Sequence, residues 1–190
     1  NKYLDTDDFV NWKDKNFGLM MLYKFEMIHR YLNNNEFVLY LDGDIVIKKD
    51  IEEYLIKSIK NKDIIFQDDT NPRYPNKQTL CAGFMFIRSN KKTIKFFNPN
   101  NLNIEKISNY AFHDQTYINK NKNKLNYGVL PLKVFSSGAY FYNNFNNYEP
   151  SMIHFNYVVG YEKKELMQSF RRILGLGRCN PNGRRNTSCS

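Results

Sequence analysis

The chain has 190 residues, of which 42% are hydrophobic and 16% aromatic, and it carries a formal net charge of +9 at pH 7. This length suffices for one well-filled core, and the aromatic content excludes disorder over most of the chain. No run of about 18 apolar residues occurs, so no membrane span is predicted, and the polar start predicts no signal peptide. We therefore expect a soluble protein, with the cytoplasm as the favoured location.

The positive charge favours an anionic partner, such as a phosphorylated small molecule, a nucleic acid or a membrane surface. The lysines are scattered and no nucleic-acid motif is visible, so we expect no nucleic-acid partner. Asn and Lys are abundant throughout, and such a compositional bias also explains the charge without any partner. Cys81 lies beside a predicted strand and is expected to be a buried free thiol, whereas Cys179 and Cys189 can pair in an oxidising compartment.

Apolar residues recur at helical spacing from Leu19 to Leu32, which predicts a helix that ends at three asparagines. The next run, Phe37–Leu41, is continuous and apolar, as is typical of parallel strands buried on both faces. Asp50 and Glu53 then have the spacing of a capping box at the start of a helix. The inner face of that helix is predicted to comprise Tyr54, Leu55 and Ile59.

Further strands are predicted at Ile64–Phe66 and Gly83–Ile87, and further helices from Asn90 to Phe97 and from Asp114 to Lys120. Two more strands, Val129–Phe135 and Ala139–Tyr142, are predicted around a turn at residues 136–138. Strands that alternate with helices predict an α/β fold, with helices around a mostly parallel sheet. We expect one domain over residues 1–170. The last twenty residues contain five of the eight arginines and no lysine, so residues 171–190 are predicted to be a flexible tail.

The strongest chemical feature is Asp42-Gly43-Asp44, which directly follows the apolar strand 37–41. Open α/β sheets bind ligands at the carboxyl ends of their strands, so both carboxylates are predicted to lie at a binding edge. Gly43 lets a ligand or metal approach the backbone closely. Two neighbouring carboxylates repel each other unless a cation lies between them, which favours a hard divalent ion, Mn²⁺ or Mg²⁺. The alternative is a turn with two solvated acids.

A second group of polar residues lies far downstream. His154 ends another apolar segment and is the histidine that we expect to complete the metal shell begun by the two aspartates. Lys163 follows Gly160 and is suited to neutralising a phosphate. The alternative for His154 is a structural histidine.

Five motifs in order carry a family resemblance: Leu41–Asp44, Cys81–Arg88, His113–Gln115, Phe135–Gly138, and His154 with Gly160 and Lys163. The set, over roughly residues 24–167, resembles nucleotide-diphospho-sugar transferases of the GT-A fold. It is most similar to the group that includes the plant cell-wall xylosyltransferases, and more distantly to glycogenin and the bacterial galactosyltransferases.

This resemblance implies a metal-dependent glycosyltransferase that uses a UDP-sugar donor and retains the anomeric configuration. It implies that Asp42, Asp44 and His154 bind Mn²⁺ or Mg²⁺, and that Lys24 and Lys163 contact the donor. Gly83, Gly138 and Gly160 would line the donor site, with Gly83 letting the backbone approach the sugar. Asp114 and Gln115 would face the anomeric carbon, although Asp114 could instead only cap its helix. The acceptor, a glycan, a protein or a small molecule, is not implied.

One departure from the family pattern and two alternative functions stand beside this interpretation. GT-A domains open with a βαβ unit that binds the nucleotide base, but only one helix precedes Asp42, so that unit is predicted to be incomplete. A haloacid-dehalogenase-like phosphatase also starts with a strand followed by Asp-x-Asp. In that family the acidic pair comes last, but here the candidate pair, Asp68-Asp69, precedes the candidate second motif, Phe86–Ser89. The order of the motifs therefore argues against this alternative. A non-catalytic binder of nucleotide sugars or polyanions is the other alternative.

Overall fold

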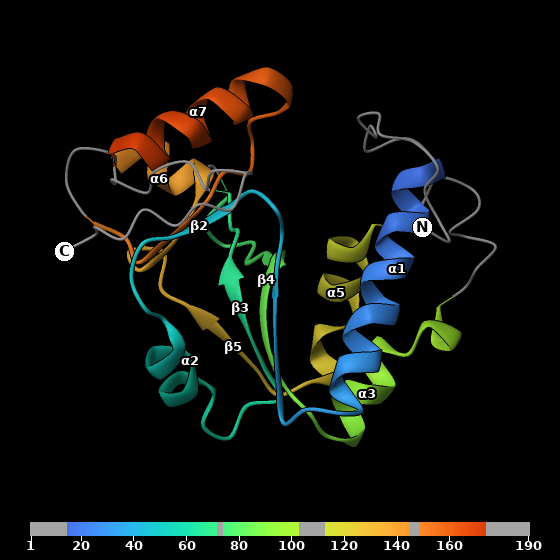
Figure 1. Cartoon of the computed structure of the whole chain (residues 1–190). Helices are drawn as coiled ribbons and strands as arrows, with labels where there is room; N and C mark the ends of the chain where they lie inside the picture. Colours follow the sequence, from blue (N-terminus) through green and yellow to red (C-terminus); the bar gives the residue numbers. More distant parts are fainter. Residues whose placement is uncertain (1–14, 72–73, 103–112, 145–148, 174–190) are drawn as a thin grey trace, which may run out of the picture.

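The computed structural model describes residues 15–71, 74–102, 113–144 and 149–173 (Figure 1). They form a four-stranded sheet with the order β1-β4-β3-β5 and a three-stranded sheet with the order β2-β7-β6. The elements are α1 Lys15–Leu32, β1 Phe37–Leu41, β2 Ile45–Ile47, α2 Glu52–Ile59, β3 Ile64–Asp68, β4 Leu80–Arg88, α3 Lys91–Phe97, η1 Pro99–Asn101, α5 Asp114–Asn121, η2 Lys122–Lys124, β5 Tyr127–Leu130, β6 Phe135–Ser137, α6 Gly138–Asn144, β7 Met152–His154 and α7 Gly160–Ile173. None of the described helices has the length and apolar character needed to span a bilayer.

The larger sheet is mixed. β1, β3 and β5 run in one direction, as the predicted parallel sheet requires, but β4 runs the opposite way between β1 and β3. Helices α1, α3 and α5 cover one face and α2 lies on the other (Figure 1). The α/β architecture with helices on both faces is therefore confirmed, with one antiparallel strand that the sequence pattern did not reveal.

The two faces of this sheet divide the apolar core. Along β3, Ile64 and Phe66 pack with Phe25 of α1, whereas Ile65 packs with Leu55 of α2. This alternation follows from the two-residue period of a strand, and it explains why the central strands are continuous apolar runs. The edge strand β1 is different, since Leu39 is 39% exposed and lines a cavity. The expectation that residues 37–41 are buried on both faces is thus wrong, because part of β1 faces this cavity and is not covered by another element.

The smaller sheet was not predicted. Its strands have three residues each, too few for a clear periodic signal, and α6 and α7 pack on it through Phe141 and Phe170. The predicted strand Ala139–Tyr142 is helical, and the predicted turn residues Ser136 and Ser137 belong to β6. The predicted strand Val129–Phe135 is divided between β5 and β6.

Helix boundaries also differ in part from the predictions. Asn90 caps α3 through a capping box with Thr93, as the spacing indicated. At α2, Asp50 accepts the Glu52 N–H at 2.9 Å but no box forms, because the helix starts after Ile51. Tyr54, expected on the inner face of α2, is 40% exposed, although its ring centre lies 5.3 Å from that of the buried Phe135. The predicted tail was expected to start at residue 171, but residues 171–173 belong to α7. Residues 174–190, which include Cys179 and Cys189, lie outside the described residues.

Candidate active site

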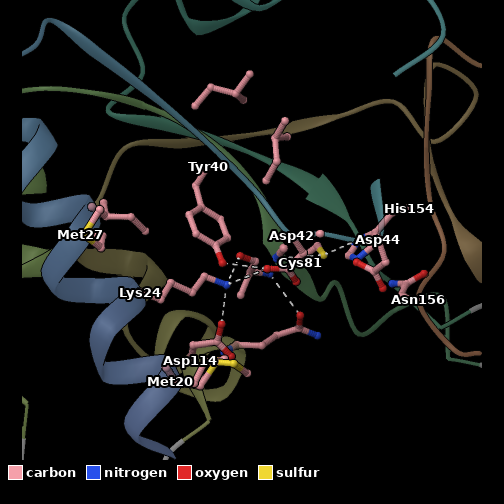
Figure 2. Close-up of a pocket in the computed structure, with 18 of the residues that line it drawn as sticks. Met20, Lys24, Met27, Tyr40, Asp42, Asp44, Cys81, Asp114, His154 and Asn156 are labelled. Carbon is pink, nitrogen blue, oxygen red and sulfur yellow. Dashed lines mark hydrogen bonds and ion pairs between the residues drawn. The ribbon is translucent and has the colours of Figure 1, made fainter. Parts of the chain in front are cut away.

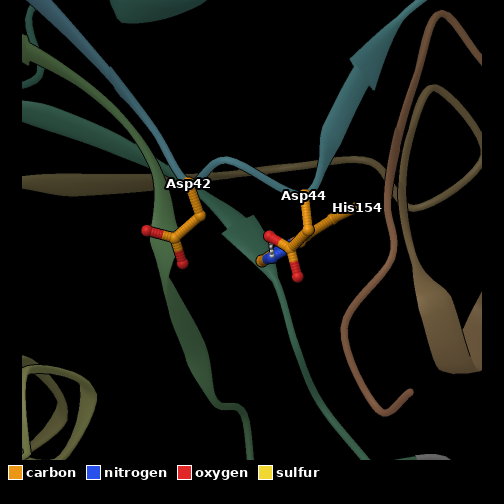
Figure 3. A group of neighbouring side chains, drawn as sticks. All are labelled: Asp42, Asp44 and His154. Carbon is orange, nitrogen blue, oxygen red and sulfur yellow. Dashed lines mark ion pairs between the residues drawn. The ribbon is translucent and has the colours of Figure 1, made fainter. Parts of the chain in front are cut away.

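Asp42 and Asp44 lie where the chain passes from the larger sheet to the smaller one (Figure 3). The Asp42 N–H donates to the Gly83 carbonyl of β4 at 2.8 Å, which fixes Asp42 to the larger sheet. In the smaller sheet, Ile45 pairs with His154, and the Phe155 N–H donates to the Asp44 carbonyl at 2.9 Å. The register of β2 with β7 therefore brings His154 beside the two aspartates.

These three side chains form a compact donor set. One possible ligand atom from each of Asp42, Asp44 and His154 lies within 4.8 Å of the others. The His154 Nε2 is 3.1 Å from Asp44 Oδ1, and His154 is buried. Two carboxylates and an imidazole suit Mn²⁺, and carboxylates also suit Mg²⁺. The residues present thus fit the predicted divalent ion.

Gly83 makes this arrangement possible. A Cβ at this position would lie 2.5 Å from Asp42 Oδ2 and 2.5 Å from His154 Cε1. The backbone of β4 therefore forms the floor under both candidate ligands. The candidate ligands thus take the space that a side chain at Gly83 would need, and its expected approach to the sugar stays a prediction.

Lys163 of α7 reaches the same cluster. Its Nζ lies 2.5 Å from Asp44 Oδ2. Burial alone would raise the pKa of Asp44, but hydrogen bonds and charge from His154 and Lys163 lower that pKa well below its usual range. Asp44 is therefore ionised at neutral pH, which is the form that binds cations. Gly160 begins α7 with φ +64°, a conformation that favours glycine, and it lines with Lys163 and Asp44 a hollow of about 430 Å³.

On the other side of Asp42 lies a buried lysine (Figure 2). The Lys24 ammonium of α1 donates to Asp114 Oδ2 at 2.7 Å and to the Ala82 carbonyl at 2.6 Å, and it lies 3.5 Å from Asp42 Oδ1. The Tyr40 hydroxyl also donates to Asp42 Oδ1, at 2.9 Å. Burial alone would lower the pKa of Lys24, but the carboxylates of Asp114 and Asp42 outweigh it and raise that pKa. A charged lysine thus links the candidate metal cluster to Asp114.

Gln115 is held from both ends of its amide. Its Oε1 accepts the Ala82 N–H at 3.1 Å, and its Nε2 donates to Asp69 Oδ2 at 3.0 Å. The other Asp69 oxygen accepts from the Asn156 amide at 2.9 Å and the Tyr157 hydroxyl at 3.0 Å. Burial raises the pKa of Asp69, and these three hydrogen bonds oppose that rise. Asp69 therefore connects the start of α5 with the segment after β7.

A cavity of about 920 Å³ joins these groups. Its polar end contains seven of the predicted site residues, namely Lys24, Asp42, Asp44, Gly83, Asp114, Gln115 and His154. Its apolar end lies between α1 and β1 and includes Met27 and Leu39. Gly138 does not line this cavity. Its N–H donates to the Asn156 side chain at 2.6 Å, and a Cβ there would lie 2.3 Å from the Asn156 carbonyl oxygen, so its close contacts are with protein.

The sequence interpretation missed several polar residues of the site. Asp69 had been considered only for the phosphatase alternative, although it follows a predicted strand and could have been found by that position. Tyr40, Gln67, Asn156 and Tyr157 lie in apolar or unremarkable segments and gave no signal. Cys81 is confirmed as a buried free thiol, and burial raises its pKa. It is therefore not a reactive thiolate.

Comparison with known proteins identifies the family to which this fold and site belong. The profile of the nucleotide-diphospho-sugar transferase family matches residues 2–167. The chain belongs to this family, which places it among the glycosyltransferases and sets aside the phosphatase alternative.

Individual proteins support the same placement. The UDP-galactose:fucoside alpha-3-galactosyltransferase of Dictyostelium discoideum is 29% identical in an alignment of 189 positions. The alignment covers 87% of this chain but only 29% of that protein. Among solved structures, a glycosyltransferase involved in glycosylation of the major capsid of PBCV-1 matches with a TM-score of 0.59 at 13% identity, over 87% of this chain and 81% of its own. The galactosyltransferase LgtC, solved with donor and acceptor sugar analogs, matches with a TM-score of 0.56 at 12% identity, over 86% of this chain and 69% of its own. These two structures support the predicted GT-A fold.

Proposed function

We propose that this chain transfers a sugar from a UDP-sugar donor, with Mn²⁺ or Mg²⁺ held by Asp42, Asp44 and His154, and that it retains the anomeric configuration. The observation that carries the proposal is the convergence of these three donor groups in one cavity with Lys24 and Asp114. When bound, the ion would neutralise the charge that develops on the departing diphosphate. Lys163 is within reach of the same place and would add a second positive charge.

The buried pair of Lys24 and Asp114 would orient the donor sugar. Both Asp114 oxygens already accept hydrogen bonds, one from Lys24 at 2.7 Å and one from the Gln115 N–H at 2.8 Å. A carboxylate engaged in this way is a weak nucleophile, so we favour a positioning role for Asp114 over a covalent intermediate. Asp114 is not the N-cap of α5, because His113 occupies that position. Asp114 is the first residue of the helix, where one oxygen accepts the Gln115 N–H and the other accepts from Lys24.

Retention then follows from attack on the face from which the diphosphate leaves. The bond between the anomeric carbon and the diphosphate oxygen breaks, and its electron pair goes to UDP. The acceptor hydroxyl oxygen bonds to the anomeric carbon, and its proton passes to the released diphosphate oxygen. In this route, the polar end of the cavity would have to hold the donor sugar and the acceptor hydroxyl together and exclude water.

UDP-galactose is the first donor to test, because the name of the Dictyostelium relative specifies this donor. The experiment is release of UDP from UDP-galactose and from other UDP-sugars, with Mn²⁺, with Mg²⁺ and with EDTA. The proposal expects metal-dependent UDP release from at least one UDP-sugar, slow with water and faster with a suitable acceptor. UDP binding without turnover of any UDP-sugar, with or without candidate acceptors, would instead favour the non-catalytic binder.

A further inference from the structure

Gln67 is a fully buried polar residue next to the candidate metal cluster. It lies on β3 between Phe66 and Asp68, and its exposed fraction is 0%. The sequence pattern ended this strand at Phe66 and assigned Gln67 no role. A buried amide is costly unless its donor and acceptor are both satisfied, so the partners of Gln67 indicate what it does.

Those partners fix the orientation of the amide. Gln67 Nε2 donates to the Phe135 carbonyl at 3.3 Å, and Gln67 Oε1 lies 2.9 Å from His154 Nδ1. In the flipped amide, oxygen would face the Phe135 carbonyl, so two acceptors would oppose each other. The oxygen therefore faces His154. Because this oxygen can only accept, His154 Nδ1 must carry a hydrogen.

The second nitrogen of the ring is then determined. With the hydrogen on Nδ1, the neutral imidazole keeps a lone pair on Nε2, which is the nitrogen 3.1 Å from Asp44 Oδ1. A lone pair facing a carboxylate is repulsive unless a proton or a metal ion lies between them. Without an ion, a proton on Nε2 joins it to Asp44, and a divalent ion that replaces this proton meets the Nε2 lone pair.

We infer that Gln67 is a positioning residue that holds His154 in the Nδ1–H tautomer and in the ring orientation needed for Nε2 to bind the divalent ion with Asp42 and Asp44. This inference rests on the proposed metal site. The Cys81 Sγ also lies 3.4 Å from His154 Nδ1, but sulfur is a weak acceptor and cannot replace the amide oxygen. Groups that orient a ligating histidine contribute roughly 10- to 100-fold to metal affinity.

Two substitutions separate positioning from packing. Gln67→Met keeps the side-chain length and fills the core but removes the acceptor. Gln67→Glu keeps an acceptor for Nδ1–H. It also places a charge in the core and turns a second carboxylate oxygen toward the Phe135 carbonyl. Affinity for Mn²⁺ alone, without nucleotide, is measured by electron paramagnetic resonance of the free ion on protein shown to be folded by circular dichroism.

The positioning role predicts that Gln67→Met weakens Mn²⁺ binding by about 10- to 100-fold, while Gln67→Glu binds within a few-fold of the wild type. A role in packing alone predicts the reverse order, because methionine suits an apolar core and a buried carboxylate does not. Asn119→Leu is the matched control. It also removes an amide that bonds to the sheet backbone, here at Leu80, but Asn119 lies outside the candidate site, so the Mn²⁺ affinity of this variant should be unchanged.

A second readout uses the unmodified chain. In the Co²⁺-loaded protein, His154 bound through Nε2 gives a strongly shifted, exchangeable proton signal from Nδ1–H, which disappears in His154→Ala. Wild-type Mn²⁺ affinity in Gln67→Met, equal losses in both Gln67 variants, or absence of that proton signal would overturn the inference and leave the proposed function standing. Failure of the wild type to bind Mn²⁺ would overturn the inference and the metal site together.

Discussion

Substitution of Gly83 by alanine tests whether β4 forms the floor of the metal site. The new Cβ would lie 2.5 Å from Asp42 Oδ2 and from His154 Cε1, whereas ordinary contacts start at 3.4 Å, so both groups must retreat by about 3.4 − 2.5 = 0.9 Å. Metal sites tolerate deviations of only about 0.2 Å in ligand distance. Overpacking of this kind costs about 1–3 kcal/mol, and the part of this cost that the metal-free site relieves lowers metal affinity, by at most roughly 150-fold.

The assay is Mn²⁺ titration of folded Gly83→Ala, followed by electron paramagnetic resonance, with Gly43→Ala as the control. Gly43 lies between Asp42 and Asp44, yet a Cβ at this position would meet nothing within 4 Å. We expect a loss of metal affinity in Gly83→Ala and near wild-type affinity in Gly43→Ala. Equal affinity in Gly83→Ala and the wild type would refute the packing argument. An equal loss in both variants would mean that any added methyl disturbs the loop.

Three further predictions concern charge. The Lys163 ammonium and a metal ion compete for Asp44, so Lys163→Met should bind Mn²⁺ alone more tightly. The same variant should bind UDP with Mn²⁺ more weakly, because it lacks the second positive charge at the diphosphate. Calorimetry that shows both affinities falling would contradict this competition. Asp114→Asn should reduce turnover at least tenfold while UDP affinity stays nearly constant, because the residue would act on the sugar; NMR of the wild-type product should show an α-linkage from an α-linked donor, and a β-linkage would contradict retention. The pKa of Asp44 is lowered in the folded state, so the stability that its charge confers is present above the unfolded value of about 3.9 and is lost as pH falls below it. In EDTA, the difference in urea midpoint between the wild type and Asp44→Asn should therefore shrink below about pH 4, and a difference that grows on acidification would show that the sign is wrong.

Much of the larger sheet could be predicted because its central strands are buried on both faces. Continuous apolar runs such as Gly83–Ile87 follow from that environment. Strand direction could not be predicted, since a buried antiparallel strand has the same composition as a parallel one. The smaller sheet escaped because strands of three residues carry little periodicity, and the segment Ala139–Tyr142 is apolar enough to suit either a strand or a helix.

The candidate metal cluster was easier to predict than its surroundings. Polar residues at the ends of apolar strands often form sites, and three of them, Asp42, Asp44 and His154, lie together in the structure. Gln67 and Asp69 act through contacts with residues distant in the chain, which composition and spacing do not encode. Gly138 shows the ambiguity of a glycine in a sequence, since a glycine needed for close packing against Asn156 resembles one needed at a ligand site.

The central claim is that Asp42, Asp44 and His154 hold a divalent ion that binds UDP. The most direct measurement is calorimetric titration of UDP into the wild type, Asp42→Ala and Asp44→Ala, each in Mn²⁺ and in EDTA. We predict that the wild type binds UDP in Mn²⁺ and only weakly in EDTA, and that both variants lose the difference between the two conditions. Unchanged UDP affinity in either variant with Mn²⁺ present would contradict the account.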